Sequence, residues 1–524
     1  LARVPGWLWY ALALAACLSV LAINGRPLFY WDTVGYITQG SEALEQVGLI
    51  DPAPAGATGG ADGIVAAAPK ATVDGSRSIA YSLFFGALAQ LGLLDLADLI
   101  HAIAVLAAIW LPARIAVRVY APDLPVAALV GLPVLVAAFG SLPFVVSYLM
   151  PDIFAPILLL MIATLVAFAR HMTRAECLIA FALGAFAVVA HLSHLAIAAA
   201  MVPVAILAAL ILSGWRGFIG IGLVVLILLA GFGQQFAFRA AATRVADAQV
   251  VIKPFITARL IQDGVGYAFL EDICPDAAIR TCLLYAELQK SDDPWRLTAS
   301  HILFQTDARL GSLKLMSEQD QRLVAEEQRN FFLAVLRDRP VAVLWALTRN
   351  TLRQAGMFSV DMTLPTENIV RQHDGVPGML SGSFQAGRLS PDGPWLRSLT
   401  WLQGLLYAAS LAVTGLLVVQ RHRLPKELRG FAIVLVLGIL ANAFVCGALS
   451  QPATRYGMRV IWLLPLVATM LLLFARFVAA GRRDDRNHIR HRSCLPRRTY
   501  PAARACPADG DEGAGRCGRG DRRR

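Results

Sequence analysis

Apolar runs of bilayer-spanning length recur along most of the chain. A transmembrane helix needs about 20 predominantly apolar residues, because the hydrocarbon core is about 30 Å thick and each helical residue rises about 1.5 Å. The pattern therefore predicts an all-α polytopic membrane protein with about ten transmembrane helices. The predicted spans are residues 7–24, 99–117, 126–147, 153–169, 176–191, 194–213, 217–237, 399–420, 430–449 and 459–478. A shorter run, 79–94, is interrupted by Gln90 and is predicted to be interfacial or re-entrant.

The apolar stretch from Cys177 to Leu212 is too long for a single crossing. Its 36 residues would form a helix of about 54 Å, well beyond the thickness of the hydrocarbon core. We therefore place a break at His191–Leu192–Ser193–His194, where polar side chains interrupt the run.

Arginine and lysine gather in alternate connections between these spans, which predicts a cytoplasmic amino terminus by the positive-inside rule. The connections predicted to be cytoplasmic carry Arg114 and Arg118, Arg170 and Arg174, Arg216, then Arg421, Arg423, Lys426 and Arg429, and finally Arg476, Arg482 and Arg483. The polar candidates then share the external face, namely Asp32, Asp152, His191, His194, the segment Arg239–Ser398 and Arg455–Tyr456. The alanine- and arginine-rich composition indicates a bacterial inner-membrane protein, in which that face is periplasmic.

The overall composition agrees with a multi-pass membrane protein. Of the 524 residues, 57% are hydrophobic and only 16% are charged, and the mean hydropathy is +0.59, which excludes an ordinary soluble domain. The first apolar span has no small-x-small cleavage site before Asn24, so we expect it to be retained rather than removed as a signal peptide. Leu1 in place of Met indicates an alternative start codon or a truncation.

The net charge of +11 does not predict a nucleic-acid partner, because most of it lies in one tail. Residues 481–524 hold thirteen arginines against six acidic residues. This tail has almost no apolar content and no periodicity, which is typical of disorder. A basic tail beside a membrane helix can contact anionic lipid. Read-through of low-complexity coding sequence would give the same composition, so we assign the tail no function.

Four parts are predicted along the chain. An N-terminal transmembrane bundle (1–237) contains the first external loop (25–78), and a mainly helical external domain (238–398) follows it. C-terminal transmembrane helices (399–480) precede the disordered basic cytoplasmic tail (481–524). The external domain shows helical periodicity over Glu318–Arg337. Cys274 and Cys282 share this segment, and an oxidising periplasm favours a disulfide between them over two free thiols.

The main candidate for chemistry is Asp32, within Tyr30–Trp31–Asp32–Thr33–Val34–Gly35–Tyr36, directly after the first span. A carboxylate at a membrane boundary is costly to desolvate, so it tends to persist where it binds or reacts with something. An ordinary polar residue in the loop after a helix is the alternative interpretation.

The arrangement resembles the GT-C superfamily, the integral-membrane glycosyltransferases that use polyprenyl-phosphate-linked sugars. It is most similar to the branch of lipid A aminoarabinose transferases and protein mannosyltransferases. Three features carry the resemblance: Asp32 followed by Tyr36; the stretch from Gly75 to Phe84; and Arg455–Tyr456 with Arg459 and Pro465. The chain departs from many relatives in having one carboxylate at this motif instead of two, and Gly75–Ser76–Arg77–Ser78 in place of a Lys-Pro-Pro-like element.

The resemblance implies roles for individual residues. Asp32 would act as general base or orient the acceptor, because glycosyl transfer requires removal of a hydroxyl proton. Arg455, with Arg459 or Arg77, would bind the donor phosphate, since a guanidinium matches phosphate oxygens in a bidentate manner. Tyr36 and Tyr456 would line the substrate site. The partners implied are the polyprenyl-phosphate sugar and membrane lipid, and a divalent cation is the cofactor that relatives imply.

Three further residues have competing interpretations. Asp152 follows Pro151 at a predicted helix start, where capping of free backbone amides is favoured over catalysis or metal binding with Asp32. His191 and His194 are three positions apart and would share a helical face. They could ligate a metal, but capping of the helix break is the more common role, and no three-ligand motif is visible.

Two other classes of function fit the membrane layout. A secondary transporter or lipid flippase would place polar groups near the bilayer midplane and show repeated halves. The predicted spans are nearly free of charge and no repeat is found at matched positions, which favours an enzyme. A ligase or polymerase of the O-antigen type would depend on arginines of the large external loop rather than on Asp32.

Overall fold

The computed structural model of the chain describes residues 4–50, 72–214, 217–245, 247–274, 279–376, 378–380 and 382–477. The predicted disordered tail, 481–524, lies outside these residues, as does the part of the first predicted external loop from 51 to 71. Helices make up most of the described chain, and its strands are confined to one short pair.

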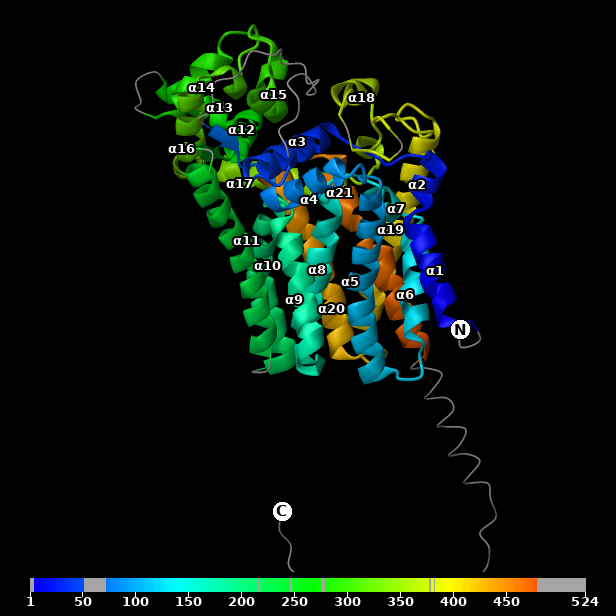
Figure 1. Ribbon diagram of the computed structural model, residues 1–524. Coiled ribbons are helices and arrows are strands. Elements are labelled where there is room, and N and C mark those ends of the chain that lie inside the picture. Colours follow the sequence, from blue (N-terminus) through cyan, green and yellow to red (C-terminus); the bar gives the residue numbers. More distant parts are fainter. Residues whose placement is uncertain are drawn as a thin grey trace, which may run out of the picture. The chain divides into compact units, whose positions relative to one another are not determined.

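Seven helical segments of the described chain are long and apolar enough to cross a membrane. They are α5 (Leu96–Tyr120), the segment Pro151–His171 around α8 (Phe154–Phe168), α10 (Leu192–Ser213), α11 (Gly217–Val245), α19 (Trp395–Val419), the segment Lys426–Ala448 formed by α20 (Lys426–Ala443) and a π-helical turn (Phe444–Ala448), and the segment Thr454–Phe477 that begins with α21 (Thr454–Ile461). The chain is therefore a multi-pass membrane protein. Figure 1 shows the long helices side by side in one bundle.

The other three predicted spans are shorter or broken, so the structure does not establish ten crossings. The first is divided into α1 (Gly6–Cys17) and α2 (Ser19–Asn24), and the third into α6 (Val126–Ala137) and α7 (Leu142–Val146). The fifth, α9 (Arg174–Val189), has 16 residues. Its end and the start of α10 at Leu192 confirm the predicted break at His191.

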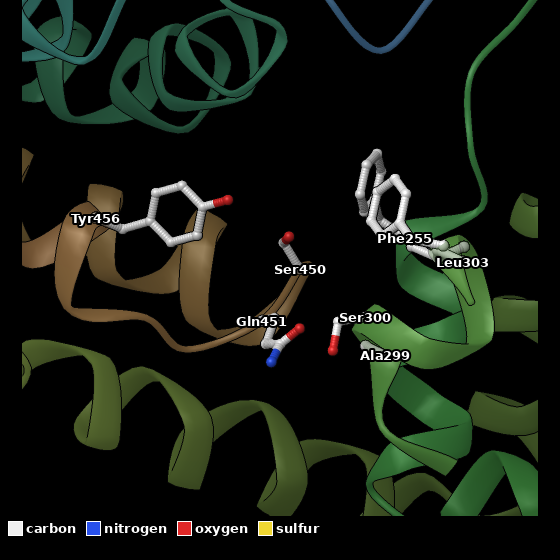
Figure 2. A pocket seen from close by; sticks show the side chains of 8 residues that line it. Phe255, Ala299, Ser300, Leu303, Ser450, Gln451 and Tyr456 are labelled. Atoms are coloured by element: carbon white, nitrogen blue, oxygen red, sulfur yellow. The ribbon is translucent and has the colours of Figure 1, made fainter. Parts of the chain in front are cut away.

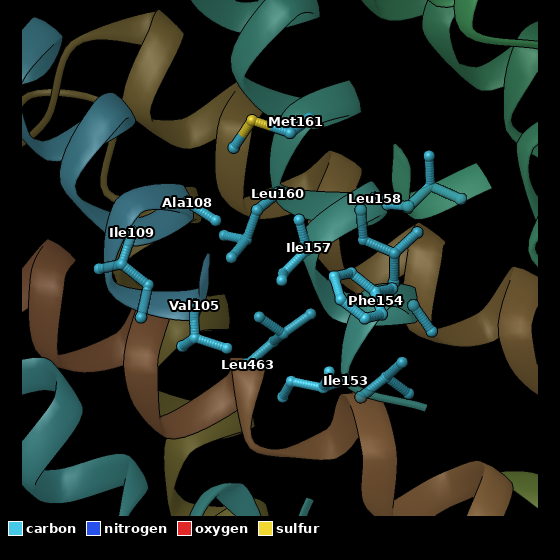
Figure 3. Close-up of a cluster of buried hydrophobic side chains, with 14 of the residues drawn as sticks. Val105, Ala108, Ile109, Ile153, Phe154, Ile157, Leu158, Leu160, Met161 and Leu463 are labelled. Carbon is cyan, nitrogen blue, oxygen red and sulfur yellow. The ribbon is translucent and has the colours of Figure 1, made fainter. Parts of the chain in front are cut away.

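The helices pack around α8, whose residues are all buried. Side chains of α5, α8 and the final helical segment interlock there, as Figure 3 shows for Val105, Ile157 and Leu463. Burial on every face explains why α8 is apolar all round. At one end of α9, the side chains of Thr173 and Glu176 each bond the other's backbone amide, which satisfies donors left free by the first helical turn.

A second hydrophobic cluster lies in the segment between α11 and α19, which we call the α12–α18 domain. The cluster is formed by α12 (Phe255–Gln262), α13 (Val265–Ile273), α14 (Thr281–Leu288), α15 (Ala299–Phe304), α16 (Glu318–Asp338) and α17 (Pro340–Ala355). The last helix of this segment, α18 (Glu367–Gln372), packs with the first cluster through Ile369. The helix predicted over Glu318–Arg337 is α16. A disulfide joins Cys274 to Cys282 between α13 and α14. The boundary predicted at 237/238 lies within α11, which continues unbroken to Val245.

Two helices between α2 and α5, namely α3 (Trp31–Gln46) and α4 (Ile79–Gln90), form a layer across one end of the long helices (Figure 1). They pack against each other at Gly40 and Gly86. With 12 residues, α4 is too short to cross a bilayer. Between them, β1 (Thr72–Asp74) pairs in parallel with β2 (Gln249–Val251), just after α11. This pairing ties the first loop to the start of the α12–α18 domain.

Candidate functional site

Asp32 lies in the first turn of α3, where a negative side chain is stabilised by the free amides and the dipole of the helix. The turn is fixed locally because the backbone N–H of Tyr30 donates to Oγ1 of Thr33 at 3.0 Å. The hydroxyl of Thr33 in turn donates to the carbonyl of Leu149 at 3.2 Å, which anchors α3 to the chain before α8. Asp32 is thereby held at the end of the helix bundle.

Each carboxyl oxygen of Asp32 faces a different arginine. Oδ1 accepts from Nη2 of Arg77 at 3.3 Å, and Oδ2 accepts from Nη1 of Arg455 at 3.1 Å. The Asp32 side chain keeps 38% of its surface exposed, whereas Arg455 keeps only 5%. Burial raises the pKa of the Asp32 carboxyl, but the charges of Arg455 and Arg77 outweigh it and hold the pKa below its ordinary value. Asp32 is therefore an ionised carboxylate open to solvent on one side.

Beneath Asp32, the ion pairs continue into the buried end of the bundle. Nη2 of Arg455 lies 3.5 Å from Oδ2 of Asp152, and Nη1 of Arg459 lies 3.3 Å from Oδ1 of Asp152. Asn442 accepts from Nε and Nη2 of Arg459 at 3.1 and 2.9 Å, and Ser193 accepts from Nη2 at 3.2 Å. Arg459 and Asp152 are 0% and 1% exposed, so their charges depend on these partners for solvation.

Toward the α12–α18 domain, the ion pairs continue through the strand pair. Asp74, the last residue of β1, lies 3.3 Å from Nη1 of Arg77. The Nζ group of Lys253, two residues after β2, also contacts this carboxylate. Burial raises the pKa of Asp74, but Lys253 and Arg77 together hold it below its ordinary value.

These contacts form one continuous line of alternating charge, which we call the charged series. Four basic side chains alternate with three carboxylates in the order Lys253, Asp74, Arg77, Asp32, Arg455, Asp152 and Arg459. The series has one more cation than anion and joins the first loop, the strand pair and two membrane segments. An excess positive charge beside an exposed carboxylate suits a site that takes an anionic ligand.

The structure brings most of the predicted site residues together. Asp32, Arg77, Arg455 and Arg459 belong to the charged series, and the ring of Tyr456 lies 5.2 Å from the guanidinium carbon of both Arg455 and Arg459. Tyr36 does not join the series. It is 1% exposed and packs edge-on against Tyr81, with ring centroids 5.2 Å apart, so it supports the α3–α4 contact.

The prediction that Asp152 acts mainly as a helix cap is wrong. It lies inside a single 3-10 turn, Pro151–Ile153, and its side chain caps neither that turn nor α8. Its carboxylate instead pairs with Arg455 and Arg459, whose opposite charges offset the cost of burying it. Asp152 thus supplies a second carboxylate close to Asp32 through their shared partner, Arg455.

The two histidines lie at the helix break. His191 is the N-cap of α10, and its Nδ1 accepts from the backbone N–H of Ser193 at 3.0 Å. Nδ1 of His194 lies 2.8 Å from the carbonyl oxygen of Ala187. Their rings are 5.3 Å apart. Among the residues that the structure describes, no three His, Cys, Asp or Glu side chains are grouped closely enough to hold a metal ion.

Sequence reasoning missed Asp74, Lys253, Ser193 and Asn442. Asp74 directly precedes the Gly75–Ser76–Arg77–Ser78 stretch, so its position beside a candidate arginine was a usable signal. Nothing local marks Lys253, because its role depends on the parallel pairing of β1 with β2. Asn442 lies in an apolar helix, where an isolated amide was the available signal.

Comparison with protein-family models, with curated proteins and with solved structures finds no match for this chain.

Proposed function

We propose that this protein is an integral-membrane glycosyltransferase that moves a sugar from a polyprenyl-phosphate-linked donor to an acceptor hydroxyl. The observation that carries the proposal is the position of Asp32, an exposed carboxylate held between Arg77 and Arg455 at the end of a membrane-helix bundle. This arrangement offers a base, a cationic phosphate site and access from the membrane surface. The resemblance of the motifs at Asp32 and Arg455–Tyr456 to the GT-C superfamily supports the same reaction.

The phosphate of the donor would bind where Asp32 now pairs with its two arginines. Arg77 is 28% exposed and can turn toward a phosphate oxygen, while the buried Arg455 offers a fixed charge. Once a phosphate shares these cations, they stabilise the carboxylate of Asp32 less. The pKa of Asp32 then rises toward its ordinary value, so binding of the donor makes the Asp32 carboxylate a stronger base.

The proposed transfer step needs only the two substrates and Asp32 to account for its bonds, proton and electron pair. The acceptor oxygen forms a bond to the anomeric carbon as the bond from that carbon to the phosphate oxygen breaks. The acceptor proton moves to Asp32, and the electron pair of the broken bond stays on the polyprenyl phosphate. Arg455 and Arg77 stabilise the negative charge that develops on that phosphate.

A divalent cation, which the resemblance to the GT-C superfamily implies, has no evident ligands in the described residues. Asp32, Asp74 and Asp152 each face basic side chains, and no third ligand converges on any pair of them. The chemistry of these side chains is that of an arginine-based phosphate site. Arg77 and Arg455 would therefore neutralise the phosphate charge, and the proposed reaction includes no step that involves a metal.

We further propose that α1–α2, α6–α7 and α9 also cross the membrane, giving about ten spans with the amino terminus in the cytoplasm. The charged series would then face the periplasm of a bacterial inner membrane. In support, Arg118 and Arg170 form ion pairs with Glu176 and Glu427. Arg118 lies in the last turn of α5 and Glu427 in the first turn of α20, and Figure 1 shows these two helix ends on the side of the bundle opposite to α3. That distribution follows the positive-inside rule.

A transfer assay tests the proposal. Purified full-length protein in nanodiscs would receive a panel of radiolabelled undecaprenyl-phosphate sugars, and release or transfer of the label would be followed. Wild type should release or transfer sugar from at least one donor, and Asp32→Asn should lose this activity while binding undecaprenyl phosphate. Asp292→Asn, an exposed carboxylate in the α12–α18 domain, is the matched control. Full activity of Asp32→Asn would overturn the proposal, and movement of intact donor across the bilayer would indicate a flippase.

A further inference from the structure

A pocket lies where the α12–α18 domain meets the start of the last membrane segment. One wall comes from α12 and α15, and the other from α21 and the turn between the π-helical segment and α21. Its cavity volume is about 80 Å³, and about 340 Å³ when the open solvent at its mouth is counted, so a ligand would be only partly enclosed. The lining residues are Phe255, Ala299, Ser300, Leu303, Phe304, Ser450, Gln451 and Tyr456.

The lining combines aromatic rings with neutral hydrogen-bonding groups. Figure 2 shows the hydroxyl of Tyr456 directed into the space between the two walls, and Gln451 facing Ser300 across the gap. No charged side chain lines this pocket. Among the described residues, the side chains of Ser300, Ser450 and Gln451 have no hydrogen-bond partner, so their donors and acceptors are available to a ligand.

The pocket touches the charged series at two points. Tyr456 forms its wall on one side, and the guanidinium groups of Arg455 and Arg459 lie 5.2 Å from the centroid of that ring. On the other side, Nζ of Lys253 lies 5.4 Å from the centroid of the Phe304 ring. A ligand that contacts Tyr456 in the pocket would therefore lie close to the two arginines.

We propose that this pocket binds an uncharged, hydroxylated ring, the sugar unit of one of the two substrates. A sugar offers apolar C–H faces to aromatic rings and hydroxyls to the neutral groups of Ser300, Ser450 and Gln451. A phosphate is disfavoured there because no cation lines the pocket, and it is favoured at the neighbouring arginines. The two parts of a sugar phosphate thus have separate, adjoining sites. The inference rests on the proposed function, but its test does not require turnover.

Saturation-transfer NMR of methyl glycosides tests the pocket directly. A panel of methyl hexosides and pentosides would be added to the full chain in phospholipid nanodiscs. At least one glycoside should show saturation transfer with wild type. Ser300→Phe, which fills the pocket from an exposed position, should abolish it, and Gln451→Leu should weaken binding about fivefold, the loss expected from one neutral hydrogen bond. Gln372→Leu, exposed at the end of α18, is the matched control and should behave as wild type.

The same experiment separates the two sources of the sugar. With undecaprenyl-phosphate sugar already bound, loss of the glycoside signal assigns the pocket to the donor sugar. Retention of the signal assigns it to a sugar of the acceptor. Absence of an NMR saturation-transfer signal for every glycoside would overturn the inference. So would a signal that is unchanged in both Ser300→Phe and Gln451→Leu.

Binding of undecaprenyl phosphate, followed by native mass spectrometry, distinguishes this failure from failure of the proposed function. If wild type binds the lipid phosphate but no glycoside, the result contradicts the assignment of the pocket and not the proposed phosphate site. If it binds glycosides but no lipid phosphate, the result contradicts the proposed phosphate site and supports the assignment of the pocket. Ser300→Phe should retain lipid-phosphate binding, which also shows that the variant is folded.

Discussion

Asp32 and Arg455 are separated by 423 residues in the sequence, yet Oδ2 of Asp32 lies 3.1 Å from Nη1 of Arg455. The pair joins the first turn of α3 to the start of the last membrane segment. It also divides the charged series into an exposed part, containing Asp32 and Arg77, and a buried part, containing Asp152 and Arg459.

The first prediction concerns Lys253, which we place as a positioning residue for Arg77. Lys253→Met should release Asp74 to pair more closely with Arg77 and draw that guanidinium away from Asp32. We expect the KM for the donor to rise about fivefold, which corresponds to about 1 kcal/mol for a partly exposed ion pair. The kcat should change little, since Asp32 and Arg455 remain. Steady-state kinetics over a range of donor concentrations measures both quantities.

Lys290→Met provides the control for that substitution. Lys290 also pairs with a carboxylate, Glu287, but it lies on the surface of the α12–α18 domain and 53% of its side chain is exposed. Its removal should leave KM and kcat unchanged. A donor KM for Lys253→Met that matches wild type would remove its assigned role.

The second prediction concerns the close contact of α3 with α4. A Cβ atom added at Gly40 would lie 1.8 Å from the carbonyl oxygen of Ser82, so the backbones must separate in Gly40→Ala. We expect a loss of about 1–3 kcal/mol in stability, as is usual for overpacking. Transfer should fall more than stability alone explains, because α3 carries Asp32 and α4 directly follows Arg77. Thermal unfolding and the transfer rate below the melting temperature measure the two effects.

Gly233→Ala is the comparison for Gly40→Ala. Gly233 lies within α11, and a Cβ atom there would meet nothing within 4 Å. The substitution should be neutral or slightly stabilising, because alanine has the higher helix propensity. Equal behaviour of the two variants would show that the α3–α4 contact does not position the site.

The third prediction concerns the buried end of the charged series. Arg459→Met should lower the free energy of unfolding by about 3 kcal/mol, because it removes one partner of a buried ion pair and the arginine donors to Oδ1 of Asn442. Adding Asp152→Asn should recover part of this loss, because the buried carboxylate, left with Arg455 as its cationic partner, is then neutral. A double-mutant cycle of unfolding free energies tests for this coupling. Purely additive effects would contradict it.

Arg309→Met is the matched control for Arg459→Met. Arg309 pairs with Asp307 on the surface, and 89% of its side chain is exposed. Exposed ion pairs contribute between about 0 and 1 kcal/mol. The control variant should therefore unfold at nearly the temperature of wild type.

The fourth prediction is a pH dependence of stability that requires Asp32. Its pKa is lower in the folded protein than the ordinary value of 3.8, so its ion pairs stabilise the fold when the carboxylate is ionised. This contribution is complete above about pH 5 and is lost as the pH falls through 3.8 toward the folded-state pKa. Melting temperatures between pH 3 and 7 should fall more steeply toward acid in wild type than in Asp32→Asn. Parallel curves would show that Asp32 gains no charge stabilisation on folding.

The sequence by itself determined the elements that depend on local composition. Apolar length set the seven long helices and the break at His191, since a membrane helix satisfies its own backbone hydrogen bonds. Periodicity gave α16, and the aromatic motif with its single carboxylate marked Asp32. The sequence did not determine the number of spans, because the predicted spans at α1–α2 and α6–α7 are each divided into two helices. Breaks of this kind depend on packing against neighbouring helices.

Only the tertiary structure decided which charges meet. Asp152 has the sequence context of a helix cap, but its neighbours in space are Arg455 and Arg459. Lys253 enters the charged series solely because β1 pairs with β2 across more than 170 residues of chain. Ion pairing falls off with distance and is strengthened by burial. Partners are therefore fixed by where the fold places side chains, which local sequence patterns do not encode.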